Sequence, residues 1–261
     1  MPQVLASKLS LFGLPIKIAM ERVRAAGFDG IEVLLTDRFR NYTWRCQYLA
    51  KELGLILHFH QAWSSDEDPT DKKFVILGKL GYLPQQRYAL RQHIPASIRN
   101  KIVVIQADRI NERFGNHQWL QTDCIFKNGR SLLSLAEFAQ AVNKLNLPVV
   151  FDTQHYLEWK LGIFRDLSKL PTDQKKLLEL LEEGWATFGP HAKEIHLNDW
   201  APNERNVFTG TGIAPLKEFC KMVKSSGWNG YVVPEIGPKV PIPRSLDTLK
   251  KLRETVESYF A

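Results

Sequence analysis

Apolar and polar residues alternate along this chain with two periods, one typical of buried strands and one of amphipathic helices. Short apolar runs rich in β-branched residues predict strands at residues 30–35, 55–60 and 101–107, and three more around residues 149–151, 195 and 232–233. Apolar positions at helical spacing predict helices at residues 15–26, 44–53, 133–145, 172–187, 216–223 and 246–260. Strand and helix signals therefore follow each other almost throughout, which is the order of an α/β fold with parallel strands.

Two segments do not follow this alternation. Residues 64–99 open with an acidic loop and contain one weak apolar run at residues 74–77, where we expect a further strand of the sheet. Residues 111–129 are polar, and we interpret them as a long loop of the kind that forms lids or binding elements. Because the chain has no internal repeat, low-complexity tract or convincing linker, we predict that residues 1–261 form one domain.

The length of 261 residues suits a single (β/α)8 barrel, and this is the fold that we predict. Hydrophobic residues make up 44% of the chain, which is enough for a full-sized core. No apolar run has the length of a membrane span and the N-terminus lacks a signal-like apolar segment, so we expect a cytoplasmic protein. The three cysteines, Cys46, Cys124 and Cys220, form no CxxC pair and fit a reducing compartment.

The net charge of +7 permits a mild attraction to phosphates or polyanions. The basic residues are dispersed over solvated helical stretches rather than collected in one run. We therefore do not expect a dedicated nucleic-acid site. The composition is compatible with an oligomer and does not specify one.

Three apolar runs in the second half of the chain each end in a side chain that can bind a metal. Asp152, His196 and Glu235 occupy these positions. In a barrel of parallel strands all carboxyl ends open onto one face, and the active site is built there. Two carboxylates and an imidazole form a mixed oxygen and nitrogen set that suits Zn²⁺, Mn²⁺ or a similar divalent ion. The sequence therefore predicts a polar site, and a candidate metal centre, at this face.

Five short motifs occur in an order that resembles the xylose isomerase-like TIM barrel superfamily. They are GFDGIE at residues 27–32, DTQH at 152–155, IHLND at 195–199, GTG at 210–212 and VVPE at 232–235. The superfamily contains sugar isomerases and epimerases, inosose dehydratases and an AP endonuclease branch. Each motif alone is weak, but their order and their position at strand ends make the combination more specific.

The resemblance implies roles for individual residues. Asp152, His196 and Glu235 would bind a divalent metal (Zn, Mn or Mg), and Glu235 would also act as an acid and base. His155 would contact the substrate or a second metal, and Asp199 would lie nearby on the substrate side.

The fourth metal ligand of the family is a glutamate that ends the strand before the Asp152 strand. Here we place Gln106 at that position, and an alternative register places Lys127 there. An amide oxygen is a weaker ligand than a carboxylate, and an amide cannot move protons at neutral pH. The mechanism of sugar epimerases with two glutamates is therefore in question, and His155 or a water that it holds is a candidate for the missing role.

Further residues are candidates for binding the substrate. His60 belongs either to the pocket or to the core, and His58 on the same face of the strand competes with it for the pocket role. Trp63 follows a strand end and could stack on a sugar ring, and Arg205 could hold a substrate oxygen or phosphate. Glu32 matches a family position but could equally be an ion-pair partner inside the barrel.

The leading hypothesis is a metal-dependent isomerase or epimerase of a small sugar, polyol or keto-sugar, which transfers a proton next to a carbonyl. A dehydratase of the same fold is closely related to it. An AP endonuclease-like phosphodiesterase would need a D-x-H segment that does not follow Asp199. A barrel that has lost catalysis and only binds is the alternative from another class, and Gln106 is the observation that favours it.

Overall fold

The computed structural model describes residues 1–7, 9–11, 13–35, 43–61, 103–106, 118–122, 126–127, 130–131, 134–163, 167–202, 204–237 and 245–261. Eight strands form a closed barrel in the order β1-β12-β9-β8-β5-β4-β3-β2, and every neighbouring pair is parallel. The strands are β1 (Gln3–Ser7), β2 (Gly30–Leu35), β3 (Ile56–Gln61), β4 (Val103–Gln106), β5 (Gln118–Gln121), β8 (Val149–Asp152), β9 (Ala192–Asn198) and β12 (Tyr231–Glu235). The predicted (β/α)8 barrel is therefore confirmed.

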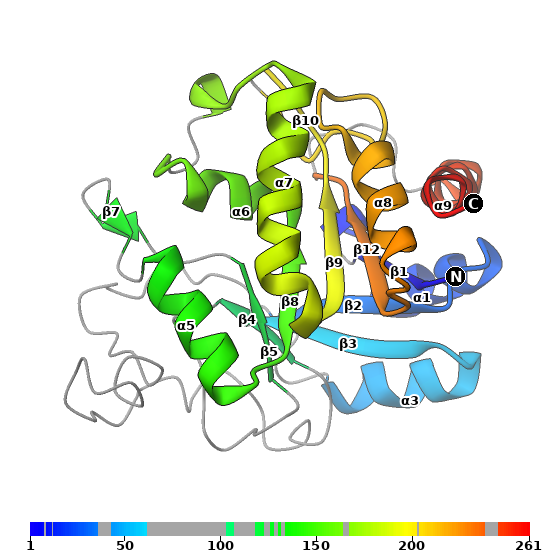
Figure 1. Cartoon of the computed structure of the whole chain (residues 1–261). Coiled ribbons are helices and arrows are strands. Elements are labelled where there is room, and N and C mark those ends of the chain that lie inside the picture. The colour runs from blue at the N-terminus through cyan, green and yellow to red at the C-terminus, as the bar shows by residue number, and fades with distance from the viewer. Residues whose placement is uncertain are drawn as a thin grey trace.

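Helices surround this barrel (Figure 1). They are α1 (Ile16–Ala25), α3 (Thr43–Leu53), α5 (Leu135–Leu145), α6 (Thr153–Lys160), α7 (Gln174–Phe188), α8 (Leu216–Ser225) and α9 (Leu246–Tyr259), with short 3-10 turns at Leu9–Leu11, Leu167–Lys169 and Gly189–His191. Two small antiparallel pairs stand outside the barrel, β6 (Phe126–Lys127) with β7 (Arg130–Ser131) and β10 (Trp200–Ala201) with β11 (Glu204–Arg205). In the described part of the chain, no helix is both long and apolar enough to cross a bilayer.

The hydrophobic core lies between the helices and the outer face of the barrel. Phe151 of β8 stacks on Phe219 of α8 and meets Trp185 of α7 edge to face. Because side chains of a strand alternate between two faces, the neighbours of Phe151 point into the barrel instead. The polar side chains at the strand ends therefore converge inside the barrel mouth, while the apolar ones stabilise the layer of helices.

The structure contains two barrel strands that were not predicted, β5 and β1. Residues 118–121, which we predicted as part of a loop, form barrel strand β5 between β4 and β8. The sequence QWLQ lacks the apolar run of a typical strand, because its last inward position carries a glutamine that faces the polar mouth of the barrel. The run at residues 74–77 lies outside the described residues, and the barrel closes without it because β3 pairs directly with β4. Strand β1 was not predicted at all.

Candidate active site

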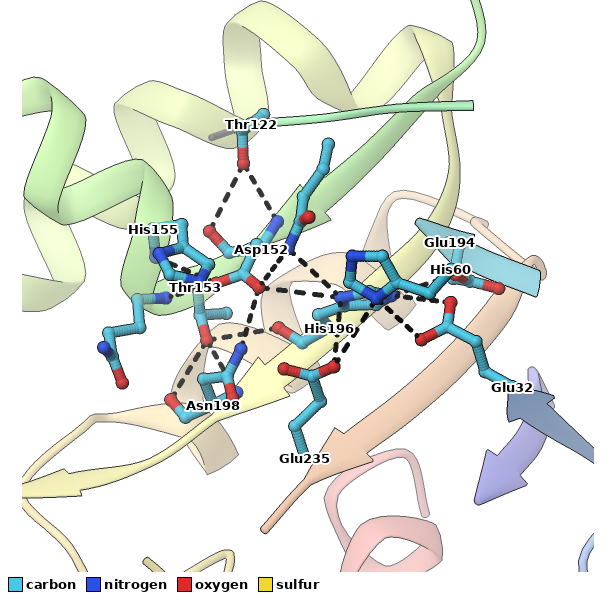
Figure 2. Close-up of polar contacts among 12 residues, drawn as sticks. Glu32, His60, Thr122, Asp152, Thr153, His155, Glu194, His196, Asn198 and Glu235 are labelled. Atoms are coloured by element: carbon cyan, nitrogen blue, oxygen red, sulfur yellow. Dashed lines mark hydrogen bonds and ion pairs between the residues drawn. The ribbon is translucent and has the colours of Figure 1, made fainter. Parts of the chain in front are cut away.

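The candidate active site is a group of buried polar side chains at the carboxyl ends of the barrel strands. Figure 2 shows His196 at its centre, with Asp152 on one side, Glu32 on the other and Glu235 below. Its side chains come from six strands. They are Glu32 of β2, His60 of β3, Gln121 of β5, Asp152 of β8, His196 and Asn198 of β9, and Glu235 of β12. Asp152, His196 and Glu235 thus meet at one face as the sequence predicted.

Asp152 is fully occupied by hydrogen bonds. It is the N-cap of α6, and its Oδ1 accepts the backbone N–H groups of Gln154 and His155 at 3.0 and 2.8 Å. Its Oδ2 accepts side-chain amide N–H groups from Gln121 and Asn198, both at 2.8 Å. Burial would raise the pKa of Asp152, but the positive charge of His155, the contact with His196 and the backbone N–H groups outweigh burial and lower it.

Gln121 takes the position that we assigned to Gln106. Gln106 ends β4, which is separated from the Asp152 strand by β5, so the prediction that Gln106 lies on the neighbouring strand is wrong. The alternative through Lys127 is also wrong, because Lys127 lies in the β6–β7 hairpin. The conclusion that an amide replaces a carboxylate remains, but it applies to Gln121. Its Nε2 also lies 3.4 Å from His196 Nδ1, so the amide bridges the carboxylate and the imidazole.

His196 is buried among acidic groups on both sides of its ring. Its Nε2 lies 3.0 Å from Glu194 Oε1 and 3.3 Å from Glu32 Oε2. Its Nδ1 lies 3.6 Å from Asp152 Oδ2 and 3.7 Å from Glu235 Oε1. Burial would lower the pKa of His196, but the surrounding carboxylates, Glu32 first among them, raise it well above its ordinary value.

His60 belongs to the site, which resolves the alternative between His60 and His58. His60 Nδ1 lies 3.1 Å from Glu32 Oε1 and 4.0 Å from Glu235 Oε1. Burial lowers and Glu32 raises the pKa of His60, with a net rise. Burial raises the pKa of Glu235. His196 and His60 lower it, but burial together with the Asp152 and Glu32 charges outweighs them, so the net shift is upward.

Four of these side chains form a group that could hold a metal ion. One possible ligand atom from each lies within 4.8 Å of the others, and the members are Glu32, His60, His196 and Glu235. Only His196 and Glu235 of this group were predicted as metal ligands. We had left Glu32 between a family position and an ion-pair partner, and we had assigned His60 to the substrate.

His58 and Glu194 lie one layer deeper in the barrel. His58 Nδ1 lies 2.6 Å from Glu194 Oε2, and both side chains are at most 1% exposed. The His58 ring meets Trp119 and Tyr231 edge to face, so it forms part of the floor below the site. The role of Glu194 was missed, although its position two residues before His196 on one strand places it on the same face.

His155 and Arg205 converge on a glutamate that we did not predict. Glu158 Oε2 lies 3.3 Å from His155 Nδ1, and Glu158 Oε1 accepts from Gln154 Nε2 at 2.9 Å and pairs with Arg205. Burial would raise the pKa of Glu158, but His155, Arg205 and Gln154 together lower it. The signal in the sequence was the helical spacing of His155 and Glu158, which puts both on one side of α6.

Asp199 has a different role from the predicted one. Its Oδ1 accepts backbone N–H groups of Trp200 and Ala214 at 2.9 and 3.2 Å, and its Oδ2 accepts those of Gly210 and Gly212, both at 2.9 Å. Both oxygens are therefore used to hold the loop after β9, and this arrangement does not support a substrate contact. Trp63 lies outside the described residues.

A metal at the position that the family resemblance implies does not fit this donor set. Each oxygen of Asp152 already accepts two N–H groups. The Asn198 amide is held in its orientation from the other end, because its Oδ1 accepts from Asn206 Nδ2. A cation at Asp152 would have to replace amide donors that are bound on a buried carboxylate.

Comparisons with known proteins agree with the fold. The family model described as xylose isomerase-like TIM barrel matches residues 107–252. Among curated proteins, none matches this sequence significantly.

Solved structures with the same fold include several sugar epimerases. D-allulose 3-epimerase from Methylomonas sp. is similar with a TM-score of 0.65 and 17% identity, over 99% of this chain and 98% of that chain. The 3-keto-D-glucoside 4-epimerase from E. coli has a TM-score of 0.59 and 15% identity, over 97% and 100%. The probable 3-DHS dehydratase from Bacillus anthracis has a TM-score of 0.54 and 13% identity, over 98% and 99%. Because the family model covers more than half of the sequence, the chain belongs to the xylose isomerase-like TIM barrel family.

Proposed function

We propose that this chain is an isomerase or epimerase of a small sugar, polyol or keto-sugar, and that it moves a proton on the carbon next to a carbonyl. The observation that carries the proposal is Glu235, a carboxylate buried at the barrel mouth whose pKa is raised by burial. A raised pKa brings a carboxyl group closer to the value at which it can both remove and return a proton near neutral pH.

His60 and His196 provide the positive charge that such a reaction requires. Removing the proton places negative charge on the carbonyl oxygen, and a preorganised cationic group lowers the energy of that state. The pKa values of both imidazoles are raised by the surrounding carboxylates, so they favour the charged form. A divalent ion, when bound in this site, would polarise the same carbonyl.

Epimerisation needs a second group that can give or take a proton on the other side of the carbon, and we assign this role to His155. Glu158 orients its imidazole, and its side chain is 23% exposed, so it can face a substrate while it stays tied to α6. Arg205, on the same glutamate, is the candidate for binding a sugar oxygen. The solved structure of a similar protein, D-allulose 3-epimerase, in complex with D-allulose supports a sugar as the substrate class.

The proposal is tested by exchange of hydrogen for deuterium from heavy water into a panel of ketoses that includes D-allulose and D-fructose. We expect exchange at a carbon next to the carbonyl for at least one sugar, and a loss of about a hundredfold or more in Glu235→Gln. Glu218→Gln, an exposed glutamate on α8, is the matched control. Folded wild-type protein that exchanges no sugar of the panel, or exchange that survives Glu235→Gln, would refute the proposal.

A dehydratase is the second candidate, and Gln121 is the observation that favours it. Elimination of water next to a carbonyl needs one base to remove the proton, and the amide at Gln121 leaves Glu235 without the second carboxylate that two-base epimerisation uses. In the same assay a dehydratase would produce a conjugated ketone that absorbs in the ultraviolet, whereas an epimerase would not.

A further inference from the structure

The strand-end face offers two places for a cation, which share His196 and Glu235. The first is completed by Asp152 and Gln121, and the second by Glu32 and His60. We propose that this chain binds a divalent transition-metal ion at the second place, displaced from Asp152 toward strands β2 and β3. The ligands are two carboxylates and two imidazoles, those of Glu32, His60, His196 and Glu235.

At the first place, both oxygens of Asp152 already accept hydrogen bonds from the protein. An ion at Asp152 Oδ2 would displace the N–H groups of Gln121 and Asn198, which lie 2.8 Å from that oxygen and are buried. Buried donors that lose their acceptor are costly, and Asn198 cannot reverse its amide without also losing its contact with Asn206. Oδ1 is held by the first backbone N–H groups of α6, so neither oxygen is available.

At the second place, the ligand atoms can bind an ion without displacing buried amide N–H groups. Glu32 Oε1 and Oε2 contact only imidazole nitrogens among the bonds that the structure describes, those of His60 and His196 at 3.1 and 3.3 Å. Where a carboxylate meets an imidazole in this way, a metal ion can replace the proton between them. Ligands about 2.0–2.2 Å from one ion lie up to about 4 Å apart, so atoms within 4.8 Å need only small side-chain movements.

The layer below this place supports the orientation of its central ligand. Glu194 Oε1 lies 3.0 Å from His196 Nε2, and the other oxygen of Glu194 pairs with His58. Glu32 Oε2 contacts the same nitrogen of His196 at 3.3 Å, so the two carboxylates together hold the ring in its orientation. In Figure 2, Glu32, Glu194 and His60 gather on one side of the His196 ring, away from Asp152.

The donor set also indicates the kind of ion. Two imidazole nitrogens and two carboxylate oxygens suit Zn²⁺, and also Mn²⁺ or Co²⁺. Mg²⁺ prefers oxygen ligands and retains its waters, so it should bind more weakly here. The inference concerns the same site as the proposed function and shares His60, His196 and Glu235 with it. Metal binding is measured without any sugar, so each can fail separately.

Isothermal titration of the metal-free full chain with Zn²⁺ tests the proposal, with Mg²⁺ as the comparison ion. We expect one Zn²⁺ per chain, and a loss of affinity of about a hundredfold or more in Glu32→Gln and in His60→Gln, since these remove direct ligands. His191→Gln, at a histidine just before the start of β9 and away from both places, should bind Zn²⁺ like the wild type. Gln121→Met removes the amide beside Asp152 but no ligand of the second place, so it should retain Zn²⁺ binding. Circular dichroism checks that each variant is folded.

The absorption spectrum of the Co²⁺-loaded protein gives an independent readout, because its visible bands change when an imidazole ligand is lost. We expect a changed spectrum for His60→Gln and an unchanged one for His191→Gln. The proposal is overturned if folded wild-type protein does not bind Zn²⁺. It is also overturned if Gln121→Met abolishes binding while Glu32→Gln and His60→Gln retain it, because the ion would then lie at Asp152.

Discussion

Replacing Gln121 by glutamate exchanges the side-chain NH2 group that donates to Asp152 for an oxygen atom. In the wild type, Gln121 Nε2 lies 2.8 Å from Asp152 Oδ2, and both side chains are buried. The new carboxyl group can restore that hydrogen bond only if it carries a proton. If it ionises, two carboxylate oxygens face each other at the same separation.

The size of the effect follows from comparing these two states. Two charges 2.8 Å apart repel by about 6 kcal/mol at an effective dielectric constant of about 20. Holding the carboxyl protonated at pH 7 costs about 3.7 kcal/mol, because its unfolded pKa is about 4.3 and each unit is about 1.36 kcal/mol. The protonated state is therefore favoured, and in the metal-free protein Gln121→Glu should lower the free energy of unfolding by about 3–4 kcal/mol at pH 7.

The sign of the pH dependence distinguishes this cause from a packing defect. A carboxyl whose folded pKa is raised destabilises the fold above its unfolded pKa, and the penalty disappears as the pH falls toward that value. The loss in Gln121→Glu should therefore shrink to about 1 kcal/mol at pH 5. Urea unfolding of both proteins at pH 5, 6 and 7 measures it. Zn²⁺ at a hundred times its dissociation constant should return about 2.7 kcal/mol to the variant.

A loss that is the same at every pH would refute this reasoning, because it would show that the new carboxyl does not meet Asp152. A loss that is absent at pH 7 would have the same meaning. Gln121→Met is the matched control, since it removes the donor without adding a titratable group and should show a nearly constant loss across the range.

Three further predictions concern residues around the site. Asp199→Asn should lower the free energy of unfolding, measured in urea, by about 2–5 kcal/mol, because an amide can accept no more than half of the four backbone N–H groups that Asp199 holds. Asp173→Asn, at the exposed cap of α7, is the control and should lower it little. Glu158→Gln should be less stable than the wild type at pH 7. Because the pKa of Glu158 is lowered in the fold, the difference in stability should shrink as the pH falls below about 4. Urea unfolding at pH 3 to 7 measures it, and a constant difference would contradict the prediction. Gly184→Ala should lower stability by about 1–3 kcal/mol in thermal unfolding, since its new methyl group would meet the ring of Tyr156, and an unchanged melting temperature would contradict that packing.

The part of the site that could be read from the sequence is the part that depends on local order. Asp152, His196 and Glu235 each end an apolar run, and strand ends of a parallel barrel meet at one face whatever the details of packing. The helices were predictable for a similar reason, because their apolar positions repeat within a few residues, as in α7 and α9. These features need no knowledge of which strand lies beside which.

Only the tertiary structure decided how these residues are used. Gln121 could not be recognised, because β5 has four residues and its inward positions are set by the neighbours β4 and β8. His196 meets Glu32 across 164 positions of sequence, a contact that exists because the barrel closes through β1. Asp199 holds a loop because the chain after it folds back over its carboxylate. A sequence shows which side chains stand at strand ends, but the closure and register of the barrel determine which atoms they meet, and therefore which of them can hold a cation and which already hold a hydrogen bond.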